Sequence, residues 1–491
     1  MTSEAVRPWP ALWAMVLGFF MILVDATIVS IATPAIMAAF GADVDTVVWV
    51  TSAYLLAYAV PLLITGRLGD RFGPKRVYLV GLAVFTLASL WCGLTTSIGG
   101  LVVARIVQGL GASLLSPQTM NVITRTFPAD QRGRAMSLWG AAAGIAVLVG
   151  PILGGLLIDA LGWEWIFFVN VPVGVVGLVL AARLVPTLST SVHRFDLLGV
   201  ALSAVGMFLL VFGIQEGQAF DWGPIAWGMI GAGVAVLALF VIWQARNPAE
   251  PLVSLSLFRD RNFSLANIAV TTLGFAVTAQ AFPITLYAQG VRGLTPTGAA
   301  LLLAPAAVIS TILAPFVGRL TDRAHPRWIA GFGLGCFAVG LLWLAAVMRP
   351  DTPTWALVLP IGLTGIGSGF MWAPVSTAAT RNLPMHQAGA GAGVYNTTRQ
   401  VGAVLGSAGI AALMQSRLAV EVPGGAAGGS AEAAVAQLPP ALHDGFSTAM
   451  AQSLVLPAVV ILVGAAAALC FATPVHLRRA TAREPATTAA D

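Results

Sequence analysis

Asp25 is the residue of this 491-residue chain whose surroundings most strongly indicate chemistry. It is the one acidic residue well inside a long apolar run, which covers about residues 11–38. A charge at the centre of a bilayer costs about 2.5–3.5 kcal/mol on the insertion scale unless it has a partner. Because burial favours the neutral carboxyl, Asp25 could bind and release a proton near physiological pH. The alternative is a fixed structural ion pair.

Arg105 is the candidate partner of Asp25. The two residues lie in separate apolar runs, and at about 1.5 Å per residue they reach nearly the same depth in a core of about 30 Å. Gln108 follows Arg105 by three residues and therefore shares its helix face. Movement of the arginine could switch the proton affinity of Asp25. The alternative is a static contact that holds the first and fourth helices together.

Arg399 is a third charge inside an apolar run. It could face a substrate cavity, or it could extend toward the nearby membrane surface. Aromatic and amide side chains are further cavity candidates, although each could equally serve ordinary packing: Tyr54, Tyr58, Trp139, Gln280, Trp372, Tyr395 and Asn396. No histidine pair or His/Cys cluster has the spacing of a metal site, so we expect neither a metal nor a cofactor. The energy source would be the proton gradient.

The elements that position these residues are expected to be membrane-spanning helices. Hydrophobic residues make up 58% of the chain and charged residues only 9%, whereas soluble domains carry about 25% charged residues. A span needs about 20 apolar residues. Fourteen runs meet this condition, which predicts an all-α polytopic membrane protein: 11–38, 46–66, 77–96, 98–121, 135–157, 164–184, 196–215, 226–244, 264–288, 297–318, 328–348, 355–379, 391–415 and 449–472.

The positive charges predict the orientation. With the N-terminus in the cytoplasm, 20 of the 25 Lys and Arg residues fall on the cytoplasmic side and three on the outer side. This asymmetry follows the positive-inside rule and places both termini in the cytoplasm. The net charge of +5 is therefore a signal of topology and not of nucleic-acid binding.

Internal repeats divide the chain. The segment 66–71 recurs as 318–323, at an offset of 252 residues, and 124–133 recurs as 380–389, at an offset of 256. These repeats indicate two parallel six-helix bundles, and such repeats place the substrate site between them near mid-membrane. The predicted parts are a first bundle, a two-helix central insert, a second bundle and a cytoplasmic tail: 1–185, 186–262, 263–475 and 476–491.

Only the first repeat carries the charges. At the same offsets Arg105 corresponds to Ile361 and Asp25 to Val277. Proton chemistry is therefore expected in the first bundle alone.

Five segments resemble motifs of one transporter family: 25–29, 66–76, 105–109, 144–155 and 163–172. The chain resembles the major facilitator superfamily, and specifically its fourteen-helix drug:proton antiporter branch (the EmrB/QacA type). Pro74 and Glu164 stand where that pattern usually has arginine. The resemblance implies two six-helix bundles plus two inserted helices, fourteen in all.

The resemblance also assigns roles. Asp25 and Arg105 would couple protons, supported by Gln108 and Gly109. A cytoplasmic gating loop would comprise Gly66, Asp70, Arg71, Gly73 and Lys75 with the echo Asp322 and Arg323. An antiporter motif would form a tight seam between the repeats, the alternative being ordinary helix packing; it comprises Gly144, Gly150, Pro151, Gly154 and Gly155.

The function expected from these residues is proton-coupled efflux of amphipathic drugs by alternating access. The alternative is a dedicated exporter or symporter of one metabolite or antibiotic. A membrane enzyme or an ATP-driven pump is disfavoured because the sequence has no P-loop and no catalytic cluster. The expected partners are the lipid bilayer, protons and a small amphipathic substrate, with no nucleic acid. We expect a monomer in the cytoplasmic membrane of a bacterium.

Overall fold

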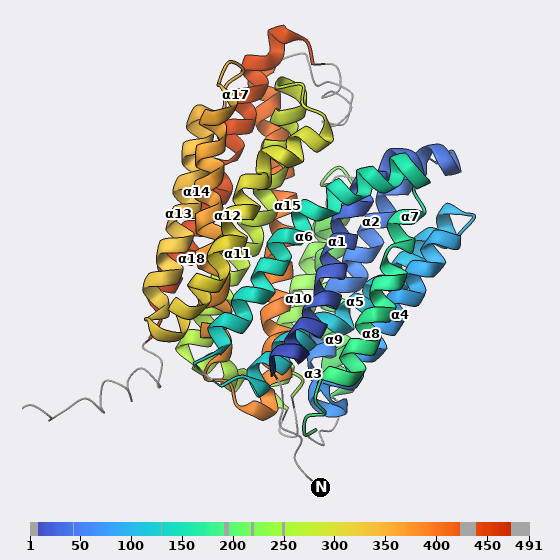
Figure 1. Ribbon diagram of the computed structural model, residues 1–491, viewed down its shortest axis with the longest axis vertical. Coiled ribbons are helices and arrows are strands. Elements are labelled where there is room, and N and C mark those ends of the chain that lie inside the picture. Colours follow the sequence, from blue (N-terminus) through green and yellow to red (C-terminus); the bar gives the residue numbers. More distant parts are fainter. Residues whose placement is uncertain are drawn as a thin grey trace, which may run out of the picture.

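The structure is a computed structural model, and it describes residues 8–42, 44–128, 130–190, 196–217, 220–247, 251–422 and 438–472. The predicted tail 476–491 lies outside these ranges. The described residues form helices and connecting turns, with no strand among them. Figure 1 shows the helices running along the length of the molecule in two groups that lie side by side.

The first half of the chain forms the group drawn in blue to green-blue in Figure 1. Here α4 packs on α5, α2 packs on α5, and α1 packs on α6 and α8. Its helices are α1 (Pro8–Phe40), α2 (Val44–Ala59), α3 (Leu62–Phe72), α4 (Pro74–Leu94), α5 (Ile98–Thr126), α6 (Arg132–Leu161), α7 (Trp165–Phe168) and α8 (Asn170–Leu184).

A helical hairpin follows, with α9 (Leu197–Gln215) packed on α10 (Pro224–Arg246). Asp196 caps α9 by accepting from the backbone N–H of Gly199 at 2.9 Å, and it also accepts from Trp243 and Gln244 near the end of α10. One carboxylate thus joins both ends of the hairpin. The short 3₁₀ helix η1 (Leu255–Arg259) leads into the second half.

The second half forms the group drawn in yellow to red in Figure 1. In it α13 packs on α14 and α18, and α11 packs on α15 and α18. Its elements are α11 (Arg261–Leu286), the π-helical turn η2 (Tyr287–Val291), α12 (Pro296–Arg323), α13 (Pro326–Val347), α14 (Thr354–Thr380), η3 (Met385–Gln387), α15 (Ala388–Glu421), η4 (Pro440–Leu442), α17 (His443–Ser453) and α18 (Val455–Leu469).

Twelve helices in the described part are long and apolar enough to cross a membrane, and the bent pair α2–α3 would raise the number to thirteen. The span predicted over 46–66 corresponds to a bent pair of helices: the chain bends by 47° where α2 gives way to α3, next to Pro61. Proline cannot donate a backbone hydrogen bond, which explains the break. The predicted span 135–157 falls within α6, a helix of 30 residues.

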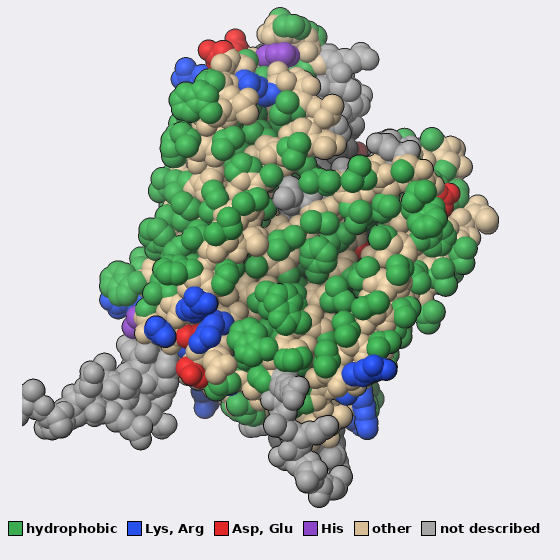
Figure 2. Space-filling model, in the orientation of Figure 1, with side chains coloured by type: hydrophobic (Ala, Val, Ile, Leu, Met, Phe, Trp, Pro, Cys, Tyr) green, Lys and Arg blue, Asp and Glu red, His purple; other side chains and the backbone are tan. Residues whose placement is uncertain are grey.

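The outer surface suits a lipid environment. Large apolar side chains such as Trp13, Leu87, Ile312 and Trp355 are mostly exposed on the flanks of the helices. On the face drawn in Figure 2, green side chains cover the flank, while Lys and Arg gather mainly toward the end where the chain begins. We call this the basic end; α3, α5, α12 and α14 finish there.

The two halves meet mainly at the basic end and diverge toward the end that carries α7 and α17 (Figure 1). The contacts between them run from α6 to α12 and α14, and from α15 to α3 and α5. The conformation is therefore one in which the halves are closed together at the basic end.

Candidate functional site

A buried charge cluster lies inside the first half. Asp25 and Arg105 are both 0% exposed, and the Arg105 Nη1 lies 2.5 Å from the Asp25 Oδ2. The other carboxylate oxygen, Oδ1, accepts from the side-chain amides of Gln108 and Asn170, each at 2.9 Å. Both oxygens of the carboxylate are thus occupied, as the cost of burying a charge requires.

Further contacts fix the arginine. The Arg105 Nε donates to the backbone carbonyl of Val50 at 3.0 Å, and its guanidinium lies 4.0 Å from the ring centroid of Tyr54. Its Nη2 is buried without a hydrogen-bond partner in the described part of the chain. The predicted proximity of Asp25 and Arg105 is confirmed as a contact, and Gln108, predicted only to share the helix face of Arg105, binds the same carboxylate.

Sequence reasoning missed two members of the cluster, Ser89 and Asn170. The Ser89 hydroxyl accepts from Gln108 at 2.6 Å and from Asn170 at 3.3 Å. Asn170 is the first residue of α8, where the chain restarts after the short helix α7. The signals for Asn170 were an amide within an otherwise apolar run and its place in the motif segment 163–172; Ser89 gave none, because serines are common in membrane helices.

Tyr54 is placed differently from the prediction. It is fully buried beside Arg105, and its hydroxyl donates to the backbone of Ile22 at 3.3 Å. Gly109 explains how the helices fit, since a Cβ there would meet the backbone oxygen of Tyr54 at 2.5 Å. Tyr54 therefore belongs to the charge cluster in this conformation.

At the basic end, Asp70 of α3 connects the two halves. Its carboxylate accepts from the backbone N–H groups of Gly389 and Ala390, both at 2.9 Å, at the first turn of α15. Asn121 of α5 donates to the same carboxylate at 3.3 Å. An acidic side chain at a helix N-terminus satisfies free N–H groups and complements the helix dipole.

Asp322 of α12 makes the equivalent contact in the opposite direction. It accepts from the backbone N–H groups of Gly133 at 2.7 Å and Arg134 at 3.4 Å, at the first turn of α6. The Arg134 Nε also lies 3.7 Å from the same carboxylate. The offsets of 252 and 256 residues convert one contact into the other, so the two form a repeat-related pair, which we call the terminal locks.

Glycines allow the halves to come this close. A Cβ on Gly66 would lie 2.5 Å from the carbonyl oxygen of Gly389, and one on Gly133 would lie 2.7 Å from that of Gly318. These four glycines also correspond by the two repeat offsets. Gly133 and Gly389 were visible in the repeat, but their contact with the other half was not.

The remaining gating-loop candidates lie at the end of α3, at the start of α4 and at the end of α12. Gly73 has a φ of +90°, which explains why glycine joins α3 to α4. Lys75 is half-buried and Arg323 is exposed, and neither has an ion pair within the described ranges. Arg71 lies over the ring of the adjacent Phe72, at 5.3 Å.

Two glycines of the antiporter motif pack within the first half and not between the halves. A Cβ on Gly150 would collide with Thr27 of α1, and one on Gly154 would lie 2.8 Å from Ile28. The predicted seam between repeats is therefore wrong for these two residues. Gly144 does face Ser310 of α12, at 3.9 Å, and Gly155 borders open space. The side chain of Pro151 lies outside the described part.

Three of the other cavity candidates, Tyr58, Arg399 and Trp372, make contacts between the halves. Tyr58 shares a hydrogen bond of 2.9 Å with Ser116, and Arg399 of α15 donates to the Tyr58 hydroxyl at 3.4 Å. Trp372 lies against Gly140 of α6. Trp139 is buried and stacks on Phe19, while Gln280 is half-buried on α11.

Several polar atoms in this region are buried without a described hydrogen-bond partner. They are Trp139 Nε1, Tyr395 Oη, Asn396 Oδ1 and Arg399 Nε. Buried polar atoms are normally paired. The region between α5, α6 and α15 therefore offers both donors and acceptors for a further polar group.

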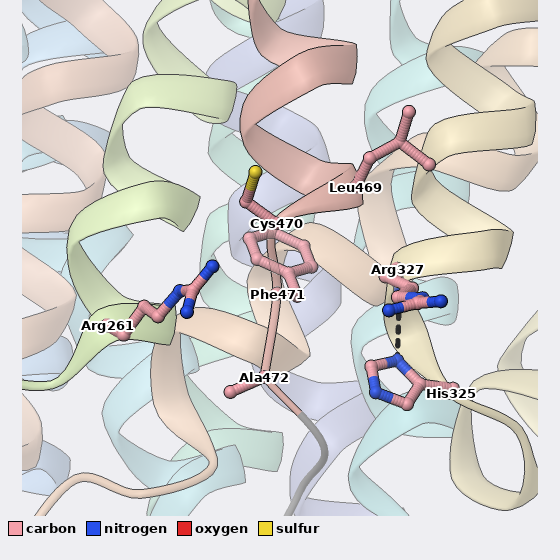
Figure 3. A pocket seen from close by; sticks show the side chains of 7 residues that line it. All are labelled: Arg261, His325, Arg327, Leu469, Cys470, Phe471 and Ala472. Carbon is pink, nitrogen blue, oxygen red and sulfur yellow. Dashed lines mark hydrogen bonds between the residues drawn. The ribbon is translucent and has the colours of Figure 1, made fainter.

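A pocket of about 320 Å³ near the start of α11 and α13 lies apart from all these residues (Figure 3). It is lined by Arg261, His325, Arg327 and the end of α18. Burial, followed by the positive charge of Arg327, lowers the pKa of His325. None of the predicted site residues lines this pocket.

The fold and the buried charge cluster define a class: a polytopic helical membrane transporter built from two helical halves. A model of the Major Facilitator Superfamily matches residues 15–407. The chain belongs to this superfamily, whose members are transporters.

Curated relatives cover most of the chain. It is 56% identical over 94% of its length to an uncharacterized MFS-type transporter of Mycobacterium tuberculosis, of which it covers 81%. It is 35% identical to the tetracenomycin C resistance and export protein of Streptomyces glaucescens, over 84% of this chain and 77% of that one. The multidrug resistance protein Stp of M. tuberculosis is also 35% identical, over 80% of this chain and 73% of that one.

Solved structures share the fold. The human organic anion transporter TETRAN aligns with a TM-score of 0.63 and 12% identity, covering 93% of this chain and all of that one. The proton:xylose symporter XylE aligns with a TM-score of 0.62 and 14% identity, over 92% and 94% of the two chains. At such low identity the likeness concerns the fold alone.

Proposed function

We propose that this protein exports amphipathic drugs or other toxic compounds across the cytoplasmic membrane in exchange for protons. The observation that carries the proposal is the buried Asp25–Arg105 pair, the one ion pair within the described membrane helices in which both charges are fully buried. A buried carboxylate that can lose its partner is the usual basis of a proton relay.

The proton would bind at Asp25. While Arg105, Gln108 and Asn170 donate to this carboxylate it is stabilised in its charged form. A shift of α5 relative to α1 would withdraw Arg105 and Gln108 together and favour protonation. The sequence of the second half has no pair equivalent to Asp25 and Arg105, because Ile361 occupies the position that corresponds to Arg105.

Alternating access would operate at the terminal locks. We assign the basic end to the cytoplasm, from the excess of Lys and Arg there. In this orientation the described conformation is closed toward the cytoplasm, and Asp70 and Asp322 hold it closed. We also propose that the bent pair α2–α3 and α6 cross the membrane with the twelve other helices. The protein then has fourteen spans, as in the drug:proton antiporter branch, with both termini in the cytoplasm.

The substrate would bind between the halves, where Tyr395, Asn396 and Arg399 present polar atoms among aromatic side chains. Relatives named for antibiotic and multidrug resistance support an amphipathic drug. A second candidate function is export of a single antibiotic or metabolite. It is favoured by relatives whose names carry one compound, such as the tetracenomycin C export protein and a probable actinorhodin transporter of Streptomyces coelicolor.

Purified protein in liposomes tests the proposal. An imposed pH gradient should drive uptake of dyes or antibiotics into the liposomes, and Asp25→Asn should abolish this while leaving downhill exchange measurable. Asp25→Glu serves as the control, because it keeps the ionisable group. Full gradient-driven transport by Asp25→Asn would exclude the proton assignment. Transport of one compound out of a broad panel would favour the dedicated exporter.

A further inference from the structure

A large groove lies on the outer flank of the molecule between the two halves. Its volume is about 950 Å³, and its walls come from α1, α6 and α8 of the first half and α12 of the second. The lining includes Trp13, which is 59% exposed, and Leu184, which is 40% exposed. Exposed apolar side chains on membrane helices face lipid, so the groove opens toward the bilayer.

The walls are apolar for most of their extent. Trp9, Trp13 and Phe20 of α1 face Leu138 and Ile145 of α6, with Leu180 of α8 alongside. Tryptophan is enriched where membrane helices meet the head-group region. Trp9 and Trp13 lie in the first turns of α1, at the basic end. The groove therefore begins at head-group depth and continues into the hydrocarbon region.

Two arginines are the charged residues of the lining, and no acidic side chain lines it. Arg319 of α12 is exposed and has no ion pair within the described ranges. Arg134 of α6 is 43% exposed and lies 3.7 Å from Asp322, longer than a close ion pair. Both lie within a turn or two of the basic end of their helices, at the same end of the groove as Trp9.

This combination matches one kind of molecule. An apolar groove of about 950 Å³ ends at two guanidinium groups, and such groups bind phosphate oxygens through charge-assisted hydrogen bonds. Basic sites between membrane helices on the cytoplasmic side are suited to anionic lipid head groups. We propose that the groove is a binding site for an anionic phospholipid of the leaflet at the basic end, with its phosphate at Arg134 and Arg319 and its acyl chains along α1 and α6.

Such a lipid would affect the conformation of the transporter. The groove takes walls from both halves and includes Arg134, whose backbone N–H is held by the Asp322 lock. Separation of α6 from α12 would take the site apart. A ligand that binds only one conformation stabilises it by mass action. The bound lipid therefore favours the conformation closed at the basic end.

Native mass spectrometry of the purified full-length protein tests the proposal without relying on transport. The probes are dioleoyl phosphatidylglycerol and dioleoyl phosphatidylcholine, which share their acyl chains, and dihexanoyl phosphatidylglycerol, which keeps only the head group. One tight phosphatidylglycerol should bind. Since a basic residue near the surface contributes a factor of about five in affinity for an anionic lipid, Arg319→Gln should weaken binding about fivefold and Arg134→Gln with Arg319→Gln about 25-fold.

The matched control is Arg327→Gln, which removes an arginine from the smaller pocket of Figure 3 at the same end of the molecule. It should leave the tight phosphatidylglycerol in place, and dihexanoyl phosphatidylglycerol should bind far more weakly than the dioleoyl form. Equal binding of both dioleoyl lipids would overturn the proposal, as would equal losses in Arg319→Gln and Arg327→Gln. Displacement of the lipid by an excess of inorganic phosphate would point to a simple phosphate site and would also contradict it.

Discussion

Asn170 approaches the Asp25 carboxylate from α8, whereas Arg105 and Gln108 both approach it from α5. A hydrogen bond to a charged group contributes about 1.5–3 kcal/mol, and one pH unit corresponds to about 1.36 kcal/mol. Removing this donor leaves the Asp25 Oδ1 with the hydrogen bond from Gln108 alone. We therefore expect Asn170→Ala to shift the midpoint of the pH dependence of transport by about one to two pH units, as measured in liposomes across a pH series.

The control for Asn170→Ala is Ser203→Ala, which removes a buried hydroxyl that bonds within its own helix, α9. It should leave the midpoint unchanged. A lower maximal rate with an unchanged midpoint in Asn170→Ala would mean that Asn170 only supports the helix packing.

The same cluster shows what a sequence reveals about single residues. Charges inside apolar runs are rare and costly, so their depths alone identified Asp25 and Arg105 as partners. Uncharged polar residues cost less and are common in membrane helices, and for that reason Ser89 and Asn170 did not stand out. The sequence placed Tyr54 on the cavity wall, but only the packing of α2 on α5 shows that its ring lies against Arg105.

At the scale of elements, the approach of α6 to α12 depends on Gly133. A Cβ at this position would lie 2.7 Å from the backbone oxygen of Gly318, which cannot move without its helix. Overpacking of this kind costs about 1–3 kcal/mol. Gly133→Ala should therefore raise the fraction of molecules that are open at the basic end by roughly 5- to 100-fold. The measurement is the alkylation rate of a cysteine introduced where α6 contacts α12.

Gly155 provides a matched comparison on the same helix, because a Cβ there would meet nothing within 4 Å. Gly155→Ala should leave the alkylation rate as it is. If Gly133→Ala and Gly155→Ala behaved alike, the close approach of α6 to α12 would not control the opening.

The hairpin of α9 and α10 provides a test of electrostatics at the same scale. Burial raises the pKa of Asp196, but hydrogen bonds from Gly199, Trp243 and Gln244 outweigh it, so the pKa is lowered overall. A carboxyl group whose pKa is lowered by folding stabilises the fold at every pH above its pKa in the unfolded chain, near 3.9. This contribution is lost as the pH falls through the pKa of the group in the folded chain. Asp196→Ala should cost about 1 kcal/mol at pH 7.

The difference in thermal stability between Asp196→Ala and the parent should therefore shrink below about pH 4. Asp260→Ala is a useful comparison, because Asp260 caps α11 in the same way, by accepting from Phe263 at 2.8 Å. A difference that stayed constant from pH 7 to pH 3 would show that Asp196 acts through packing and not through its charge.

Hydropathy predicted the positions of the helices well and their interruptions poorly. Apolar runs report only which residues avoid water, so the restart of the chain at Asn170 and the bend beside Pro61 lay hidden within single predicted spans. Glycine motifs are ambiguous for a related reason. Small residues permit close approach of two helices but do not indicate which helix packs against them. Gly150 packs on α1 of its own half instead of on the other half.

For the whole molecule, the two repeats form equivalent contacts at the basic end, whereas the buried charge cluster in the interior occurs in the first half alone. Asp70 and Asp322 cap helices of opposite halves through matching hydrogen bonds, whereas the Asp25 cluster has no counterpart. Both locks act on one equilibrium between closed and open forms. Each hydrogen-bonded charge contributes about 1.5–3 kcal/mol, so the effects of Asp70→Asn and Asp322→Asn should multiply.

Electron-spin distances between labels at Arg76 and Arg327, at the basic ends of the two halves, measure this equilibrium directly once the native cysteines are replaced. Each single variant should increase the long-distance population by roughly 10- to 100-fold, and the double variant should approach the product of the two. If only one of the two locks held the halves closed, the substitution in the other lock would leave the long-distance population unchanged. Asp25→Asn, examined in the same way, should respond to pH differently from the parent without removing either lock, because the proton site and the locks lie in separate parts of the structure.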